Sequence, residues 1–401
     1  MTLARAYLDY NATAPLRGEA KAAMLACMDA VGNPSSVHAE GRAARALVET
    51  ARRQVSSLCW AQPADVSFTS GATEAANWVL SQPRRVIFAS RLEHACIADA
   101  AVVSGARVIE LPVAAGGRVD VEAAAAILAR HARDDAGGPP GASLVVVQAA
   151  NNETGIVQPV AEIAALAREH GCRVLVDAVQ AVGRIAVERD VLDADFLLLS
   201  SHKIGGPKGG GALVVRDGRV LRPLLVGGGQ ERRRRAGTEN VEGIVGFGAA
   251  AQAARLALDA ESVRLAALRD RLEHQALAIA PDAVVIGRDV PRLANTTCLV
   301  LAGAKAETLV IKLDLAGVAV SAGAACSAGK VGQSRVLAAM GLSPELARAA
   351  IRVSIGHTTT TADIERFLDV WRGAVAVHPA ASAAPPRTAP GRAAAAQVAA
   401  R

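Results

Sequence analysis

The first two-thirds of the chain alternate two kinds of segment, and this alternation limits the fold more than any other feature. Short continuous runs of Val, Leu and Ile are separated by Ala-rich segments whose apolar residues recur at helical spacing, as in 159–171. Continuous apolar runs of this length are typical of strands buried on both faces of a parallel sheet, with helices as right-handed crossovers. The predicted strands are 85–90, 143–148, 173–178, 195–200 and 211–216. We therefore predict an α/β fold whose mostly parallel sheet is flanked by helices.

The last third of the chain predicts a second, smaller α+β domain. Residues 242–280 favour long helices, and the apolar runs at 296–303 and 349–356 are candidate strands. The tail has the low Ala/Pro/Arg complexity of a disordered segment. The predicted parts are an N-terminal segment 1–15 that packs with the small domain, a large domain 16–258, a small domain 259–376 and the tail 377–401.

The composition limits the partners. A chain of 401 residues with 51% hydrophobic content can bury a large core. The net charge is +6, but only 20% of residues are charged and 2% aromatic, which is little for a surface that stacks on bases. The one dense basic run, Arg232–Arg235, is short and lies inside the chain, which favours a solvated or phosphate-facing loop over a nucleic-acid groove. No apolar run could span a bilayer and no signal core begins the sequence, so we expect a cytoplasmic protein without membrane contact.

The six cysteines are scattered without a CxxC pair, which argues against a metal site or a disulfide framework and for a reducing compartment. One of them stands apart. Cys326 lies in "VSAGAACSAGKVG", 320–332, where small residues predict a mobile loop and an accessible, nucleophilic thiol. The others lie in apolar contexts and are predicted to be buried small hydrophobes: Cys27, Cys59, Cys96, Cys172 and Cys298.

Polar signatures follow four of the predicted strands, where a parallel sheet binds its ligands. They are "SRLEH" after 85–89, "NNETG" after 143–148, "DAVQ" after 173–176 and "SSHK" after 195–199. A further group, "FTSGATEAAN", follows a short strand and opens a helix. Its turn Gly71–Thr73 offers N–H groups and a hydroxyl to an anion such as phosphate.

A lysine at a strand end beside a phosphate-binding turn suits the covalent attachment of pyridoxal phosphate. Lys203 fits that role, and Asp177 could keep the ring nitrogen protonated. His94 could stack on the ring and shuttle protons. Each of these residues alone is more often an ordinary ion pair or loop residue, so the hypothesis depends on their combination.

Ten motifs in one order along residues 7–367 resemble the pyridoxal phosphate-dependent cysteine desulfurases, of the class V aminotransferase-like fold and of fold-type I. They are "YLDYNATAP", "GNPSSVHAEGR", "FTSGATEAAN", "EH", "NNETG", "DAVQ", "SSHKIGGPKGGG", "RAGTEN", "SAGAACSAG" and "AIRVSIG".

The resemblance implies a role for each matching residue. Lys203 would carry the cofactor, His94 would stack on its ring, and Cys326 would take the sulfur. Asp177 would pair with the ring nitrogen and Gln180 with the ring hydroxyl. The phosphate would be held by Ala72, Thr73, Ser200 and His202, joined by Thr238 from the other subunit of a homodimer. The substrate carboxylate would be received at Asn11, Asn152 and Arg352, and Asn152 would also contact the cofactor.

The resemblance implies that L-cysteine yields L-alanine and a persulfide on Cys326. The "SxGxAC" context resembles the long-loop group, which passes sulfur to an acceptor protein for iron–sulfur clusters or other thio-cofactors. Two features depart from the family: four arginines where it usually shows a Gly near Arg233, and the Ala/Pro tail. Selenocysteine lyase or another class V enzyme is an alternative, whereas a non-enzymatic sulfur or iron scaffold would need clustered cysteines.

Overall fold

The computed structural model describes residues 5–134, 141–216, 221–323 and 334–376. Its larger part is built on a seven-stranded sheet with the strand order β2-β8-β7-β6-β5-β3-β4. The strands are β2 (Val66–Thr69), β3 (Val86–Ser90), β4 (Arg107–Leu111), β5 (Ser143–Gln148), β6 (Arg173–Asp177), β7 (Phe196–Ser200) and β8 (Gly211–Val215). The five strands predicted from the sequence are all present in this sheet.

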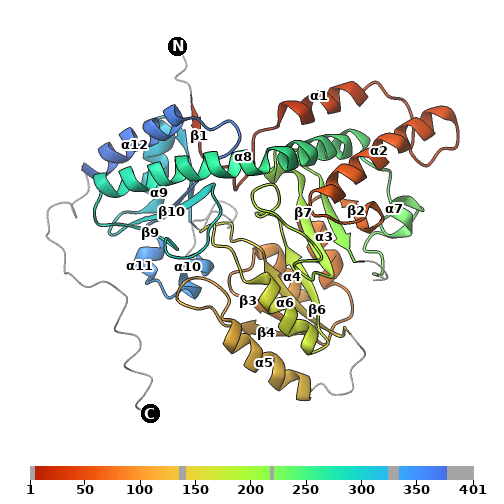
Figure 1. Ribbon diagram of the computed structural model, residues 1–401, viewed down its shortest axis with the longest axis horizontal. Coiled ribbons are helices and arrows are strands. Elements are labelled where there is room, and N and C mark those ends of the chain that lie inside the picture. Colours follow the sequence, from red (N-terminus) through yellow and green to blue (C-terminus); the bar gives the residue numbers. More distant parts are fainter. Residues whose placement is uncertain (1–4, 135–140, 217–220, 324–333, 377–401) are drawn as a thin grey trace.

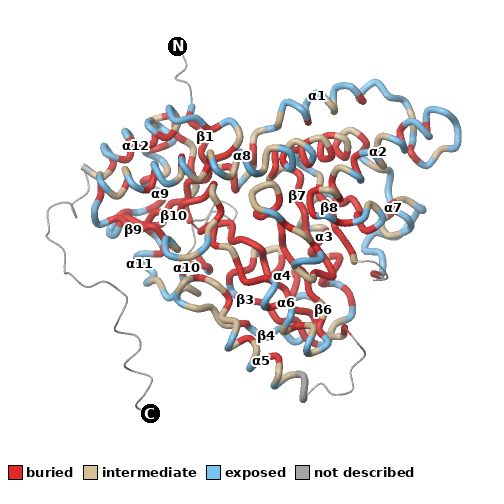
Figure 2. Tube along the Cα trace, in the orientation of Figure 1, coloured by how far each residue is buried: buried red, intermediate tan, exposed pale blue. Residues whose placement is uncertain are grey.

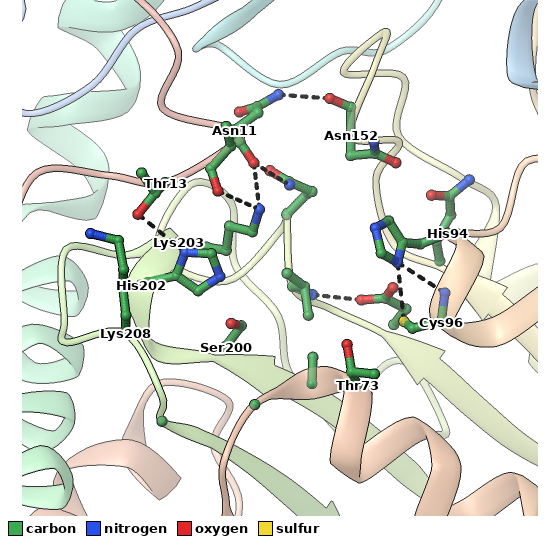
Figure 3. Close-up of a pocket in the computed structure, with 18 of the residues that line it drawn as sticks. Asn11, Thr13, Thr73, His94, Cys96, Asn152, Ser200, His202, Lys203 and Lys208 are labelled. Carbon is green, nitrogen blue, oxygen red and sulfur yellow. Dashed lines mark hydrogen bonds between the residues drawn. The ribbon is translucent and has the colours of Figure 1, made fainter. Parts of the chain in front are cut away.

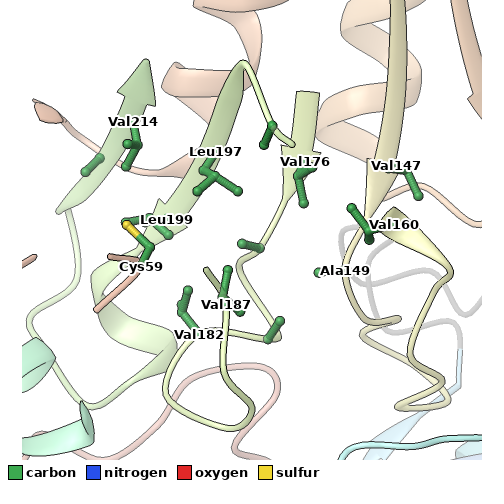
Figure 4. Close-up of a cluster of buried hydrophobic side chains, with 14 of the residues drawn as sticks. Cys59, Val147, Ala149, Val160, Val176, Val182, Val187, Leu197, Leu199 and Val214 are labelled. Atoms are coloured by element: carbon green, nitrogen blue, oxygen red, sulfur yellow. The ribbon is translucent and has the colours of Figure 1, made fainter. Parts of the chain in front are cut away.

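Helices cover both faces of the sheet, as Figure 1 shows. Alternate residues of each central strand point to opposite faces, so Val174 and Val176 of β6 pack in one apolar cluster and Leu175 in another. One face is covered by α3 (Ala72–Leu80) and α4 (Ala95–Val103), the other by α2 (Ala39–Ser57), α5 (Val121–Asp134), α6 (Val160–Glu169) and part of α8 (Val241–Ile279). Figure 4 shows part of the cluster that contains Val176, with Val147, Leu197 and Val214 from three further strands.

The sheet differs from the expectation at two strands. β8 runs antiparallel to both β7 and β2, although its apolar run resembles those of the parallel strands. β4 was not among the predicted strands; it lies at the sheet edge with mostly exposed residues, so it lacks a continuous apolar run. An apolar run records burial on both faces, which is the same for either strand direction.

A second sheet forms the smaller part, with the order β12-β13-β10-β9. Its antiparallel strands are β9 (Ala283–Val285), β10 (Thr296–Leu301), β12 (Ser321–Ala322) and β13 (Ala350–Ser354). The helices on it are α9 (Ala306–Leu315), α12 (Thr361–Ala376) and the second half of α8; the short helices α10 (Arg335–Ala339) and α11 (Pro344–Ala347) pack beside it. Two further helices, α1 (Gly18–Cys27) and α7 (Gln230–Arg233), belong to the larger part.

One helix joins the two parts. The region 242–280, predicted to hold long helices, is the single helix α8 (Val241–Ile279). Its Ala254 packs in the core of the large sheet and its Leu265 packs in the core of the small one. The domain boundary predicted at 258/259 stays a prediction; it falls between these two positions. Figure 2 shows both cores as buried strands under helices with exposed outer faces.

The N-terminal segment crosses between the two sheets. β1 (Ala6–Tyr7) pairs in parallel with β11 (Val318–Ala319), and Leu8 is buried in the core of the smaller part. The chain then bonds to β13, because the Tyr10 N–H donates to the carbonyl of Ser354. Within the described ranges, no helix is long and apolar enough to cross a membrane.

Candidate active site

The register of the large sheet brings the polar strand ends to one edge. Gln148 of β5 lies opposite Asp177 of β6, and Ser200 of β7 lies opposite Gly211, which also faces Thr69 at the end of β2. A cavity of about 590 Å³ opens there, a size typical of a small-molecule site. Its lining includes the sequence-predicted residues Asn11, Ala72, Thr73, His94, Asn152, Asp177, Gln180, Ser200, His202, Lys203 and Arg352.

Lys203 reaches into this cavity from a short 3-10 turn after β7 (Figure 3). Its Nζ donates hydrogen bonds to the carbonyls of Asn11, at 2.6 Å, and Ala12, at 2.8 Å. The Gln180 side chain donates to the same Asn11 carbonyl at 3.1 Å. The N-terminal segment is therefore a wall of the cavity, in contact with the amine.

Asp177 is the last residue of β6 and is buried at the cavity. Its Oδ1 accepts the Val179 N–H at 3.0 Å. Burial raises the pKa of its carboxyl, whereas the Val179 N–H, His94 and Lys203 act in the opposite direction. A cation placed beside it would favour the ionised carboxylate.

Hydroxyl and imidazole groups gather at one end of the cavity. Figure 3 shows Thr73, at the start of α3, and Ser200 on the same side, with Asn152 on the opposite side. His202 bonds to the Thr13 hydroxyl at 3.1 Å. Burial and the neighbouring Lys203 and Lys208 lower the pKa of His202 to about 4, so the imidazole is neutral at pH 7. This end offers a helix N-terminus and uncharged donors, with the two lysines nearby, which suits a phosphate.

The opposite end carries a buried arginine. Arg352, on the central strand β13, donates from Nη1 to the Asn152 carbonyl at 2.9 Å and from Nη2 to Asp9 Oδ1 at 2.7 Å. Its Nε is buried and has no hydrogen-bond partner among the described residues. The Asn11 side chain donates to the same Asn152 carbonyl at 3.1 Å (Figure 3). Such a guanidinium can bind a carboxylate.

His94 is the N-cap of α4, and its Nδ1 accepts the Cys96 N–H at 3.2 Å. The Cys96 thiol lies 3.1 Å from the same nitrogen (Figure 3). Cys96 was predicted to be a buried small hydrophobe, and this prediction is wrong: it is only partly buried and lines the cavity. The error arose because the helix of 95–103 is apolar overall, whereas its first turn opens onto the cavity. Cys27, Cys59, Cys172 and Cys298 are buried.

Two predicted site residues are not part of this lining. Cys326 lies outside the described residues. Thr238 lines a smaller neighbouring cavity of about 290 Å³, which shares Ser70, Gly209 and Gly210 with the large one. Its role as a phosphate ligand from a second subunit stays a prediction.

The chain belongs to the class-V aminotransferase family, since residues 6–367 match the model of that family, Aminotransferase class-V. It is 43% identical over 378 residues to a protein named cysteine desulfurase from Cereibacter sphaeroides, covering 91% of this chain and 94% of that relative. It is 39% identical over 386 residues to the IscS-like cysteine desulfurase of Mycobacterium tuberculosis, covering 92% and 96%. A solved structure of a NifS-like protein from Rickettsia africae matches with a TM-score of 0.84 at 33% identity, covering 93% of this chain and all of that one. The resemblance deduced from the motifs and the predicted fold are confirmed.

Members of this family act with pyridoxal phosphate, and the residues of the cavity fit that group. The cavity offers an amine at Lys203 for the aldehyde, a buried carboxylate at Asp177 for the ring nitrogen, and an anion-binding end at Thr73 and Ser200. Burial raises the pKa of Asp177, and a cationic ring nitrogen beside it would act against that shift and favour the ionised carboxylate.

Sequence reasoning missed two buried acids near this site. Glu93 is fully enclosed behind the cavity, where burial and the charge of Asp177 raise its pKa to about 8. Burial likewise raises the pKa of Glu153 to about 7, and its carboxylate accepts a hydrogen bond from the Ser334 hydroxyl. The motifs "EH" and "NNETG" contain both residues, but nothing in a motif shows that a carboxylate is buried.

Proposed function

We propose that this chain is a pyridoxal phosphate-dependent cysteine desulfurase. The observation that carries the proposal is the position of Lys203, whose amine lies in one cavity with an anion-binding end and a buried arginine. The curated relatives named above carry the name cysteine desulfurase over almost their whole length. The solved structure titled SspA in complex with cysteine, with a TM-score of 0.72 and 28% identity over 87% of this chain, supports the same substrate.

In the proposed reaction the Cβ–S bond of L-cysteine breaks and an S–S bond forms between that sulfur and the Cys326 thiolate. The substrate Cβ gains a proton, so the products are L-alanine and a persulfide on Cys326. The bound cofactor supplies an electron-accepting ring that weakens bonds at the substrate carbon. Apart from Cys326, the residues assigned a role in the reaction lie in the described ranges.

Lys203 is positioned to take and return the proton at the substrate α-carbon, since its amine lies in the cavity against the carbonyls of Asn11 and Ala12. Asp177 would keep the ring nitrogen of the bound cofactor protonated, and Gln180 would bond its ring hydroxyl. His94 moves a proton at the sulfur: because its Nδ1 accepts the Cys96 N–H, the neutral ring carries its proton on Nε2. Asn11, Asn152 and Arg352 receive the carboxylate. The phosphate is held by Ala72, Thr73, Ser200 and His202.

Assays on three proteins test this proposal. The wild type should release alanine from L-cysteine and accumulate a persulfide. Cys326→Ser should lose desulfuration while keeping the absorbance of the bound cofactor, and Lys203→Ala should lose the absorbance that borohydride reduces. A wild type that turns over selenocysteine but not cysteine, or a B6-supplemented protein without cofactor absorbance, would overturn the assignment.

The active unit in this proposal is a homodimer in which Thr238 completes the phosphate site of the other subunit. Exposed apolar side chains support an interface around α1 and the segment after it: Leu25, Met28, Val31 and Val37. Light scattering gives the subunit number. Thr238→Ala should weaken cofactor binding in the dimer, and a monomer with full affinity for the cofactor would contradict this arrangement.

The sulfur acceptor in this proposal is a separate protein, such as an iron–sulfur scaffold, and the compartment is a reducing cytoplasm. All five cysteines in the described ranges are free thiols, which supports a reducing compartment. Radiolabelled sulfur from L-cysteine should pass from the persulfide to the acceptor only when both proteins are present. Transfer that is as fast to small thiols as to any candidate acceptor would contradict a dedicated partner.

A further inference from the structure

Asp9 lies outside the cavity lining but contacts the residue that closes one end of it. Its Oδ1 accepts a hydrogen bond from Arg352 Nη2 at 2.7 Å, and its Oδ2 accepts one from the Ser321 hydroxyl at 2.7 Å. The side chain of Arg352 is 3% exposed and that of Asp9 is 16% exposed, so the ion pair is largely shielded from water. The carboxylate therefore holds two neighbouring side chains at once.

The backbone around this contact is fixed by the small sheet. Arg352 lies on β13, opposite Ser321 of β12 on one side and Cys298 of β10 on the other. Asp9 forms a bridge with Ser354 on the same strand, and the flanking Leu8 carbonyl and Tyr10 N–H both bond to Ser354. The Cα positions of Asp9 and Arg352 are thus set by main-chain hydrogen bonds, and only the long arginine side chain remains to be oriented.

Two acceptors orient that side chain. Asp9 binds one terminal nitrogen of the guanidinium and the Asn152 carbonyl binds the other, while the buried Nε finds no acceptor among the described residues. A guanidinium has five N–H groups in one plane, so fixing two of them fixes the direction of the rest. A ligand carboxylate then meets donors that are already ordered, which lowers the entropic cost of binding.

We propose that Asp9 is a positioning residue for the recognition of the substrate carboxylate, acting through Arg352. The inference rests on the proposed function, because it takes Arg352 as the carboxylate receptor. Asp9 brings a negative charge close to that receptor, and this charge alone would oppose a carboxylate. Asp9 therefore contributes to binding by orienting the guanidinium. Removal of the contact should weaken the binding of a ligand carboxylate.

The experiment compares two amines that differ only in the carboxylate. Cofactor-loaded protein is titrated with L-alanine and with ethylamine, and the absorbance change of the cofactor gives each Kd without any desulfuration. Asp9→Ala should raise the Kd for L-alanine about tenfold or more and leave the Kd for ethylamine unchanged. Asp9→Asn keeps an oxygen acceptor for the guanidinium and should show a smaller loss. For L-cysteine turnover, KM should rise more than kcat falls.

The matched control is Asp314→Asn, which removes the exposed ion pair that Arg5 of the same N-terminal segment makes with the small domain. This variant should bind both amines as the wild type does. An unchanged or lower Kd for L-alanine in Asp9→Ala would overturn the inference, as would an equal loss for both amines, since that would mean general damage to the cavity.

Arg352→Ala separates this inference from the proposed function. If Arg352→Ala weakens L-alanine binding and Asp9→Ala does not, Arg352 is the receptor and the role of Asp9 is refuted. If Arg352→Ala leaves L-alanine binding unchanged, the assigned role of Arg352 fails and the inference fails with it.

Discussion

The sulfur of Cys96 lies 3.1 Å from Nδ1 of His94, at the edge of the cavity that holds the Lys203 amine. The contact places a second thiol beside the imidazole that is proposed to move protons at the substrate sulfur. It also separates Cys96 from the buried cysteines, among which burial raises the pKa of Cys59 and of Cys298 to about 12.

This difference predicts an order of thiol reactivity. Iodoacetamide should modify Cys96 well before Cys59 or Cys298, because only a thiol in contact with solvent can form the reactive thiolate. Bound pyridoxal phosphate should slow the modification of Cys96 by about tenfold or more, since it fills the same cavity. Peptide mass spectrometry separates the sites. Modification of Cys96 at the same rate with and without the cofactor would show that the thiol does not face the cofactor site.

A strained turn before Thr238 predicts a stabilising substitution. Glu231, Arg232 and Arg233 have φ values of 47°, 58° and 66°, in the left-handed region that favours glycine. Arg233→Gly should stabilise the fold by about 0.5–1 kcal/mol, because relief of this strain exceeds the extra entropy of the unfolded chain. The matched substitution Arg234→Gly, at a right-handed position with φ −90°, should instead destabilise it by about 1 kcal/mol. Urea unfolding measures the change in the free energy of unfolding for each variant. Changes of the same sign in the two variants would contradict this explanation.

The same turn depends on a buried ion pair. Glu231 accepts two hydrogen bonds from Arg52, at 2.7 and 2.9 Å, and one from the Phe68 N–H at 3.0 Å. Glu231→Ala should cost about 3–5 kcal/mol, because Arg52 keeps Glu49 but loses its buried ionic partner, and the buried Phe68 N–H loses its acceptor. Glu365→Ala, which removes an exposed pair with Arg271, should cost less than about 1 kcal/mol. Similar losses of stability in Glu231→Ala and Glu365→Ala would show that burial does not strengthen the pair between Arg52 and Glu231.

Glu93 predicts a pH dependence of stability. Its pKa is raised from 4.5 to about 8, so between these values the folded chain keeps a proton that the unfolded chain releases. Stability contributed by this group therefore falls as the pH rises through that window. Glu93→Gln lacks this loss and keeps an oxygen for the Ser90 hydroxyl and the Gln148 N–H. Its stability relative to the wild type should rise from pH 5 to pH 8.

Urea midpoints measured with cofactor bound, in parallel for Glu122→Gln on the exposed face of α5, check this dependence. Glu122→Gln removes an exposed carboxylate and so controls for the loss of a carboxylate without burial. A difference between Glu93→Gln and the wild type that does not change with pH would mean that Glu93 is ionised in the folded protein throughout this range.

Much of the fold and of the cavity followed from local patterns. The apolar runs located β3, β5, β6 and β7, and residues at or just beyond their ends, such as Asp177 and Lys203, line one cavity. The direction of β8 did not follow, because burial on both faces looks the same in either orientation. Cys96 was misjudged because a helix that is apolar on average can still expose its first turn to a cavity.

The sequence by itself determined which segments are buried and which chemical groups stand at the strand ends, because periodicity and strand length record the local environment of each residue. Only the tertiary structure decided which distant groups meet. Asp9 and Arg352 are 343 positions apart, and Arg52 and Glu231 are 179 apart. No local pattern encodes such a pair, because each charged side chain could equally well be hydrated or paired with another charge without any change in the sequence around it. The packing of the two sheets and of the N-terminal segment between them largely excludes water and other charged partners from these positions.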